Sequence, residues 1–150
     1  MTDAAVKAAQ AMPGVIGVLT GLVPGVPGLS ENIRIRSILG RHLEHSRIYY
    51  FENAGSEPVI YLGSADLMPR NYFRRIECLF PVSDPGIRAE IIDVILPAYL
   101  HDHTATLLQP DGSYQAVPSP KGGKHFSAQG YFMARAEELR RREVAHPVES

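Results

Sequence analysis

The amino-acid sequence predicts a mixed α/β fold built around one hydrophobic core. The chain has 150 residues, 45% of them hydrophobic and 21% charged, so it is long enough and apolar enough for one globular domain. Short β-type runs alternate along the chain with apolar patterns of helical spacing. No internal repeat is visible, which argues against a repeat architecture.

The first elements are expected to be a helix, a strand and a loop. Residues 2–12 are rich in Ala with helical spacing, and Pro13 and Gly14 would stop that helix. Residues 15–23 form a β-type apolar run, although two glycines weaken the strand prediction. Residues 24–28 read Pro-Gly-Val-Pro-Gly, which predicts a loop. No Gly-Lys-Ser/Thr follows this loop, so a phosphate-binding loop of that type is excluded.

The middle of the chain is expected to form a helix and then a three-stranded sheet. Over residues 33–43 the apolar residues recur on one helical face, which would turn most of the arginines outward. Residues 46–51 and 59–62 have strand character on either side of a turn over residues 53–58, and residues 75–82 have it again. These three strands could form one sheet.

The remaining elements are a helix, a hairpin, a linker and a closing helix. We expect the helix over residues 84–101 and the two hairpin strands over 104–108 and 114–117. The linker is expected over 118–124 and the closing helix over 128–144. Asp84 and Pro85 are typical of a helix start, and Pro97 is expected to kink the helix that follows. Asp111 and Gly112 are typical of a hairpin turn.

Charge and cysteine content exclude several classes of protein. The net charge of -1 argues against a broadly basic nucleic-acid-binding surface. The single cysteine, Cys78, excludes an internal disulfide framework, and its apolar neighbours predict a buried, inert side chain. The sequence from Met1 has neither a signal-peptide pattern nor an apolar run of membrane-spanning length. These features predict a cytoplasmic protein that neither inserts into membranes nor binds nucleic acid.

A histidine and an arginine two residues apart give the clearest chemical signal. Twelve of the 15 basic residues are Arg, and seven of these lie between Arg34 and Arg75. His45 and Arg47 would share one face of a strand, whereas Glu52 has the wrong parity for that face. Histidine can transfer a proton or form a covalent phosphoryl intermediate, and an Arg fork stabilises charge on phosphate oxygens. This pair therefore suits phosphoryl transfer.

Three blocks of this chain resemble the C-terminal domain of bacterial polyphosphate kinases. They read P-G-V-P-G-L-S-E-N-I-R-I-R-S-I-L-G-R-H-L-E-H-S-R-I-Y-Y-F-E-N over residues 24–53, G-S-A-D-L-M-P-R-N over residues 63–71, and R-R-I-E-C-L-F-P-V over residues 74–82. The first two also resemble the phospholipase D pattern of His-x-Lys, four residues, Asp and a downstream Gly-Ser. The resemblance implies a phospholipase D-like mixed sheet flanked by helices, present here as a partial domain.

The resemblance also implies a division of the chain and a set of site residues. We expect a helical N-terminal segment over residues 1–13, the kinase-like domain over 14–117, and a linker with the closing helix over 118–150. By resemblance, His45 and Arg47 are the catalytic candidates. The substrate-binding candidates are His45, Ser64, Asp66, Arg70, Asn71 and Arg75. Arg36 and Arg41 are further phosphate-ligand candidates.

The activity implied by the resemblance is reversible transfer of the terminal phosphate of ATP onto polyphosphate. In that family a histidine of the preceding domain becomes phosphorylated, and the histidine that matches His45 faces it as a phosphate contact or proton donor. ATP is then a substrate. Mg²⁺ is expected for the complete enzyme, although no ligand for it is identified in this chain. The N-terminal kinase domains are needed as partners, in cis or in trans. The isolated chain is expected to be inactive. The family's triphosphate-binding Arg falls at about Gly17 here, and its usual Trp is Leu67.

Two alternative functions and several local alternatives stay open. The chain could be a non-catalytic remnant that binds polyphosphate or has only a structural role, or a phospholipase D-type phosphodiesterase whose site needs two copies of His45 in a homo-oligomer. Arg75 could instead form an ion pair with Glu77 or Glu52. The run from His101 to His103 is a weak metal-site signal, for which a solvated helix end is the favoured explanation, so no metal site is predicted. His42 is expected to be structural.

Overall fold

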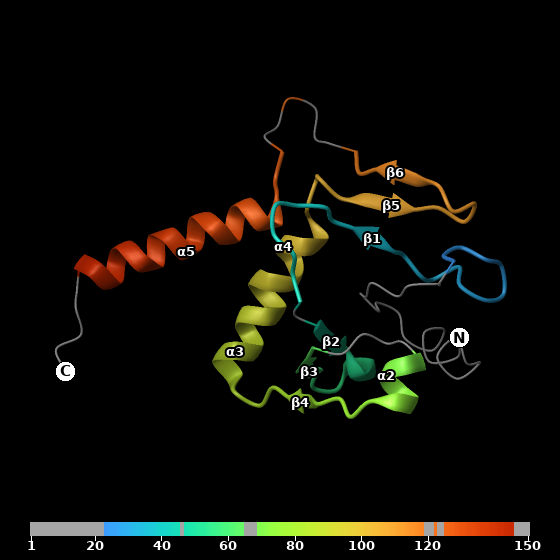
Figure 1. Cartoon of the computed structure of the whole chain (residues 1–150), viewed down its shortest axis with the longest axis horizontal. Helices are drawn as coiled ribbons and strands as arrows, with labels where there is room; N and C mark the ends of the chain where they lie inside the picture. The colour runs from blue at the N-terminus through green and yellow to red at the C-terminus, as the bar shows by residue number, and fades with distance from the viewer. Residues whose placement is uncertain (1–22, 46, 65–68, 119–121, 123–124, 146–150) are drawn as a thin grey trace.

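The fold combines two small antiparallel sheets with one long interrupted helix and a closing helix (Figure 1). The structure, a computed structural model, describes residues 23–45, 47–64, 69–118, 122 and 125–145. The expected helix over residues 2–12 and nearly all of the expected strand over 15–23 lie outside the described residues. The mixed α/β class predicted from the sequence is confirmed.

The first sheet consists of β2 (Arg47–Phe51), β3 (Val59–Gly63) and β4 (Leu79–Pro81), in that order. All its pairs are antiparallel, and the register sets Arg47 opposite Gly63. The two expected strands at residues 46–51 and 59–62 are therefore confirmed, and the third is shorter than expected. The tight turn between β2 and β3 contains the short 3₁₀ helix η1 (Asn53–Gly55).

One helix of three segments lies between β4 and the strand β5 (Thr106–Leu108) of a second sheet (Figure 1). The segments are α3 (Pro85–Ala89), the π-helical η2 (Glu90–Ile95) and α4 (Leu96–Leu100). Asp84 caps the first turn, because its Oδ1 accepts the N–H of Ile87 at 2.8 Å. The widened π turn ends just before Pro97, whose ring would clash with the carbonyl of residue 93 in a regular α-helix.

The main core lies between this helix and the β2-β3-β4 sheet. Ile60, Val82 and Ile91 are buried together at its centre. Six half-buried residues surround them: Ile48, Tyr50, Leu62, Ile92, Ile95 and Leu96. Removing one such aliphatic side chain from water contributes about 1.5–3 kcal/mol, so this cluster is a main source of stability.

The second sheet consists of β1 (Arg36–Ser37), β5 (Thr106–Leu108) and β6 (Tyr114–Ala116), ordered β1-β5-β6. The expected hairpin between β5 and β6 is confirmed. In its turn the carboxylate of Asp111 accepts the N–H of Ser113 at 2.9 Å, and Gly112 takes a φ of +82°.

The helix expected over residues 33–43 is absent, and this prediction was wrong. Ile33 and Ile35 are both buried, which is the two-residue period of an extended chain, and the following strand β1 pairs with β5. Leu39 and Leu43 would have completed the helical face, but they are 87% and 98% exposed. Pairing with β5 satisfies the backbone here, so tertiary contacts outweigh the local helical pattern.

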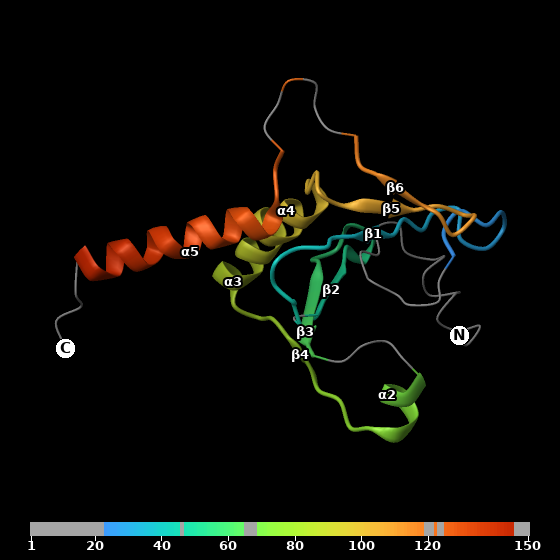
Figure 2. The ribbon, with the colours of Figure 1, turned by 45° about the horizontal axis from the view of Figure 1, so that its top comes forward.

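The segment between β3 and β4 also differs from expectation. It contains an unpredicted short helix, α2 (Pro69–Arg74), which Figure 2 shows set apart from the sheet. Cys78 is exposed, so the prediction of a buried cysteine was wrong. The physical reason is that Cys78 adjoins β4, whose residues are exposed and which pairs only with β3 in the described sheet.

The closing helix α5 (Ala128–Ala145) is confirmed at the expected position. Figures 1 and 2 show it leading away from both sheets, with its first turns beside α4. The rings of Tyr99 and Phe132 meet there, with centroids 5.5 Å apart. One turn further on, the guanidinium of Arg135 forms a forked ion pair with Glu90. No helix in the described part of the chain is long and apolar enough to cross a membrane.

Candidate functional site

His45 lies on the segment that leads into β2, two residues before the strand begins. Its side chain is exposed, and the imidazole has no hydrogen-bond partner among the described residues. Because His45 precedes the strand, strand alternation does not fix its direction relative to Arg47. The expected shared face of these two side chains therefore stays a prediction.

Arg47 opens β2 and lies opposite Gly63, the last residue of β3. Ser64 follows directly and is exposed, so a hydroxyl and a guanidinium come from neighbouring strand ends. A glycine is needed at position 63, because a Cβ there would lie 2.8 Å from the carbonyl oxygen of Cys78. The sheet pairing thus brings together the two blocks that contain Arg47 and Ser64, whereas Asp66 lies outside the described residues.

The other substrate-binding candidates lie on or after α2. The backbone of Arg70 lies in α2, and Asn71 is buried there. Arg75 follows the helix, and its Nε lies 3.2 Å from Oε1 of Glu77, so one of the two alternative ion pairs is present. The Arg75 side chain remains 62% exposed, which leaves it accessible to a ligand.

The two further arginines have different surroundings. Arg36 lies in the second sheet, and its Nη1 donates to the carbonyl oxygen of Leu100, the last residue of α4. This contact gives Arg36 a role in capping that helix. Arg41 is exposed on the segment before His45.

A hydrogen-bond network anchors the residues immediately before His45. Gln129, in the first turn of α5, accepts the backbone N–H of His42 at 3.0 Å and donates to the His42 carbonyl at 2.8 Å. The same amide donates to Oε1 of Glu44 at 2.9 Å, and the hydroxyl of Tyr99 donates to Oε2 of Glu44. Burial and the bond to the Glu44 carboxylate raise the pKa of Tyr99, so this hydroxyl stays protonated.

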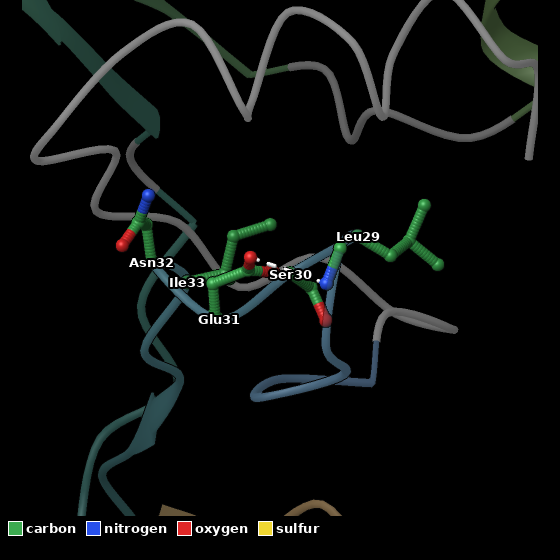
Figure 3. A pocket seen from close by; sticks show the side chains of 6 residues that line it. Leu29, Ser30, Glu31, Asn32 and Ile33 are labelled. Carbon is green, nitrogen blue, oxygen red and sulfur yellow. Dashed lines mark hydrogen bonds between the residues drawn. The ribbon is translucent and has the colours of Figure 1, made fainter.

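The Pro-Gly loop is closed by its own side chains. The buried Ser30 accepts the N–H of Val26 at 3.0 Å and donates to the carbonyl of Val23 at 2.6 Å. Glu31 accepts the N–H of Gly28 at 3.1 Å, and hydrogen bonds from its own backbone N–H and that of Gly28 lower its pKa. An open depression of about 210 Å³ lies over residues 28–33 (Figure 3). The negative charge of the Glu31 carboxylate makes this depression a poor site for phosphate.

Asp102 is a structural centre that sequence reasoning missed. The predicted solvated helix end at residues 101–103 is wrong for Asp102, which is 0% exposed. Its Oδ1 accepts both the N–H and the hydroxyl of Thr104 at 2.6 Å, and its Oδ2 accepts the N–H of Ala128 at 2.7 Å. Beside it, Nδ1 of His103 accepts the N–H of Phe126 at 3.1 Å. The Asp-x-Thr spacing is typical of a side-chain turn and was the available signal.

The described residues contain no group of three or more His, Cys, Asp or Glu side chains placed to hold a metal ion. In the run from His101 to His103, backbone N–H groups already bond to the side chains of Asp102 and His103.

Comparison with known proteins gives one consistent family. Residues 5–129 match the family model described as polyphosphate kinase C-terminal domain 2. The polyphosphate kinase of Erythrobacter litoralis is 43% identical over 141 residues, which cover 89% of this chain and 19% of that protein. The polyphosphate kinase of Neisseria meningitidis serogroup B is 52% identical over 100 residues, 65% of this chain and 14% of that protein.

A solved structure agrees with these relatives. The crystal structure of polyphosphate kinase from Porphyromonas gingivalis superposes with a TM-score of 0.70 and 35% identity, over 81% of this chain and 18% of that one. The chain thus spans less than a fifth of the length of each of these three proteins.

Proposed function

The chain belongs to the polyphosphate kinase family, whose C-terminal domain 2 it carries, and from this we propose that it supplies one half of a histidine-based site for phosphoryl transfer between ATP and polyphosphate. The observation that carries the proposal is the pairing of Arg47 with Gly63. This pairing joins the strand end that follows His45 to the one that leads into Ser64.

In this proposal the phosphoryl group moves in two steps. A histidine supplied from outside these 150 residues, in cis or in trans, attacks the terminal phosphorus of ATP, the bond to the bridging oxygen breaks, and ADP leaves. A terminal oxygen of polyphosphate then attacks the phosphorus, and the bond to that histidine breaks. His45 contacts the phosphoryl oxygens or donates a proton to the leaving oxygen, and Arg47 stabilises the negative charge.

The remaining candidates would bind the phosphates on either side of the reacting group. Ser64 can donate a hydrogen bond, and the exposed Arg75 can offer its guanidinium to a phosphate in place of Glu77. Asp66, Arg70 and Asn71 belong to the same proposal through their blocks of sequence. When bound, Mg²⁺ supplies charge neutralisation for the phosphates.

We expect no measurable transfer from ATP to polyphosphate by the 150-residue chain alone. The reason is that in-line transfer requires donor and acceptor to be held between two histidines, and this chain would contribute only His45. The measurement is formation of labelled polyphosphate from labelled ATP, with a complete polyphosphate kinase as the positive control. Robust turnover that disappears in His45→Ala would contradict the half-site and indicate a self-assembled site.

We expect the chain to bind tripolyphosphate even without turnover, because guanidinium contacts with a polyanion do not need the second histidine. In calorimetric titrations at low salt, Arg47→Ala and Arg75→Ala should each weaken binding by about threefold or more, the effect of losing one partly exposed charge contact. Arg140→Ala on exposed α5 is the matched control and should have less effect.

Salt and the control variant separate a site from diffuse attraction. Binding should weaken as ionic strength rises, because exposed charges are screened over about 10 Å at 0.1 M salt. Equal effects of Arg75→Ala and Arg140→Ala would contradict a phosphate site. Complete absence of binding would favour a structural remnant, the alternative that the glycine at about the expected Arg position, Gly17, already supports.

A further inference from the structure

We propose that Gln129 and Tyr99 are positioning residues that hold His45 in place through the backbone of His42 and the carboxylate of Glu44. This inference rests on the proposed function, because it concerns the residue that would contact the phosphoryl group. It assigns a role in the site to the start of α5 and the end of α4, two elements far along the chain from His45.

The Gln129 amide pairs with His42 in both directions. Its oxygen accepts the His42 N–H at 3.0 Å, and its nitrogen donates to the His42 carbonyl at 2.8 Å. These two bonds resemble one rung of a β-ladder, formed here by a side chain. A backbone held at both its donor and its acceptor cannot rotate freely, so the pairing fixes the direction in which the chain continues toward His45.

Glu44 is held from two helices at once. Its Oε1 accepts the Gln129 amide at 2.9 Å, and its Oε2 accepts the Tyr99 hydroxyl. Tyr99 is itself fixed against Phe132 of α5. Both oxygens of the residue next to His45 are therefore engaged by neutral donors from elements outside the β2-β3-β4 sheet.

The close approach of Gly40 shows that this contact is built into the fold. A Cβ at position 40 would lie 2.1 Å from Oε1 of Gln129, so a side chain there would displace the amide. Gln129 is placed in turn by the bond from the N–H of the preceding Ala128 to the buried Asp102.

His45 depends on these anchors because its own ring has no hydrogen-bond partner in the described part of the chain. It lies between Glu44, held by α4 and α5, and Arg47, held in β2. Neighbouring Cα atoms are held about 3.8 Å apart, so a shift of Glu44 changes the point from which the chain reaches His45. A displacement on the order of 1 Å is enough to disrupt phosphoryl transfer.

The test uses the near-isosteric variant Gln129→Glu. A carboxylate keeps the volume of the side chain but cannot donate to His42 or Glu44, and it brings a second negative charge beside Glu44. We expect about tenfold weaker binding of tripolyphosphate, equivalent to the loss of one or two net hydrogen bonds. We also expect the imidazole NMR signals of His45 to shift and broaden in the free variant.

Two further variants separate positioning from packing. Gln129→Glu combined with Glu44→Gln removes the like charges and restores an amide-to-carboxylate bond, so it should recover part of the affinity. Arg135→Gln loosens the same helix at a distance from His42 and should change affinity by less than about twofold, because it breaks one partly exposed ion pair.

The outcomes distinguish this inference from the proposed function. If Gln129→Glu folds and leaves the His45 signals of the free protein unchanged, the positioning role is wrong. If the double variant recovers nothing, a simple packing role replaces it. If the wild-type chain does not respond to tripolyphosphate, the proposed function fails, and the His45 signals of the free variants still decide the positioning role.

Discussion

Replacing Asp102 by Ala is expected to lower the free energy of unfolding by about 3 kcal/mol or more. The variant leaves three donors without their acceptor: the N–H and hydroxyl of Thr104 and the N–H of Ala128. Hydrogen bonds to a charged group contribute about 1.5–3 kcal/mol each, and the cost of burying the carboxylate offsets part of this sum. The same substitution should detach the start of α5 from α4.

The matched control is Asp111→Ala. Asp111 makes the same local turn, accepting the N–H of the residue two positions on, but it is exposed on the hairpin. Urea unfolding followed by circular dichroism should show a loss of about 1 kcal/mol or less, because water can replace an exposed acceptor. Equal losses for the two variants would mean that Asp102 does not organise the junction of α4 and α5.

Replacing Ile60 by Ala is expected to lower the free energy of unfolding by about 2–5 kcal/mol, which combines lost burial with the cavity left behind. Ile60 is 0% exposed and lies at the centre of the cluster with Val82 and Ile91. The cost should be near the upper end of this range, because the strand β3 and the helix over residues 85–100 contact the cavity from opposite sides.

Leu39→Ala is the control for this substitution. Leu39 is similar in size but 87% exposed, so its removal should change stability by no more than about 0.5 kcal/mol. Both variants can be measured by urea unfolding of the same chain. A small effect of Ile60→Ala would show that the cluster is not the core of the domain.

Local sequence patterns correctly predicted the elements in which apolar residues recur with the period of the helix or strand itself. The strands β2 and β3, the helix over residues 85–100, the hairpin of β5 and β6, and α5 all lie near their expected positions. Two of them have boundary signals that act locally: Asp84 and Pro85 at the helix start, and Asp111 and Gly112 in the hairpin. These signals do not depend on what lies across the fold.

Two of the wrong predictions are explained by strand pairing. Residues 33–43 have apolar spacing that suits a helix, yet Ile33 and Ile35 are buried in an extended segment because β5 offers a partner for β1. Cys78 has strand-like neighbours, yet β4 pairs only with β3 in the described sheet and leaves it exposed. In the first case the deciding partner, β5, is distant in sequence, and in the second the described sheet gives β4 no partner on its other side.

The sequence by itself determined the family and the candidate chemistry, because the blocks around His45 and Gly63 are continuous in sequence and can be recognised as residue patterns without a structure. Only the tertiary structure decided how that chemistry is held. The bonds from Tyr99 and Gln129 to Glu44 join residues 55 and 85 positions apart, and Asp102 reaches Ala128 across 26. The sequence does not indicate that a Gln in the first turn of a helix holds a distant loop, because that role depends on where tertiary packing places the helix.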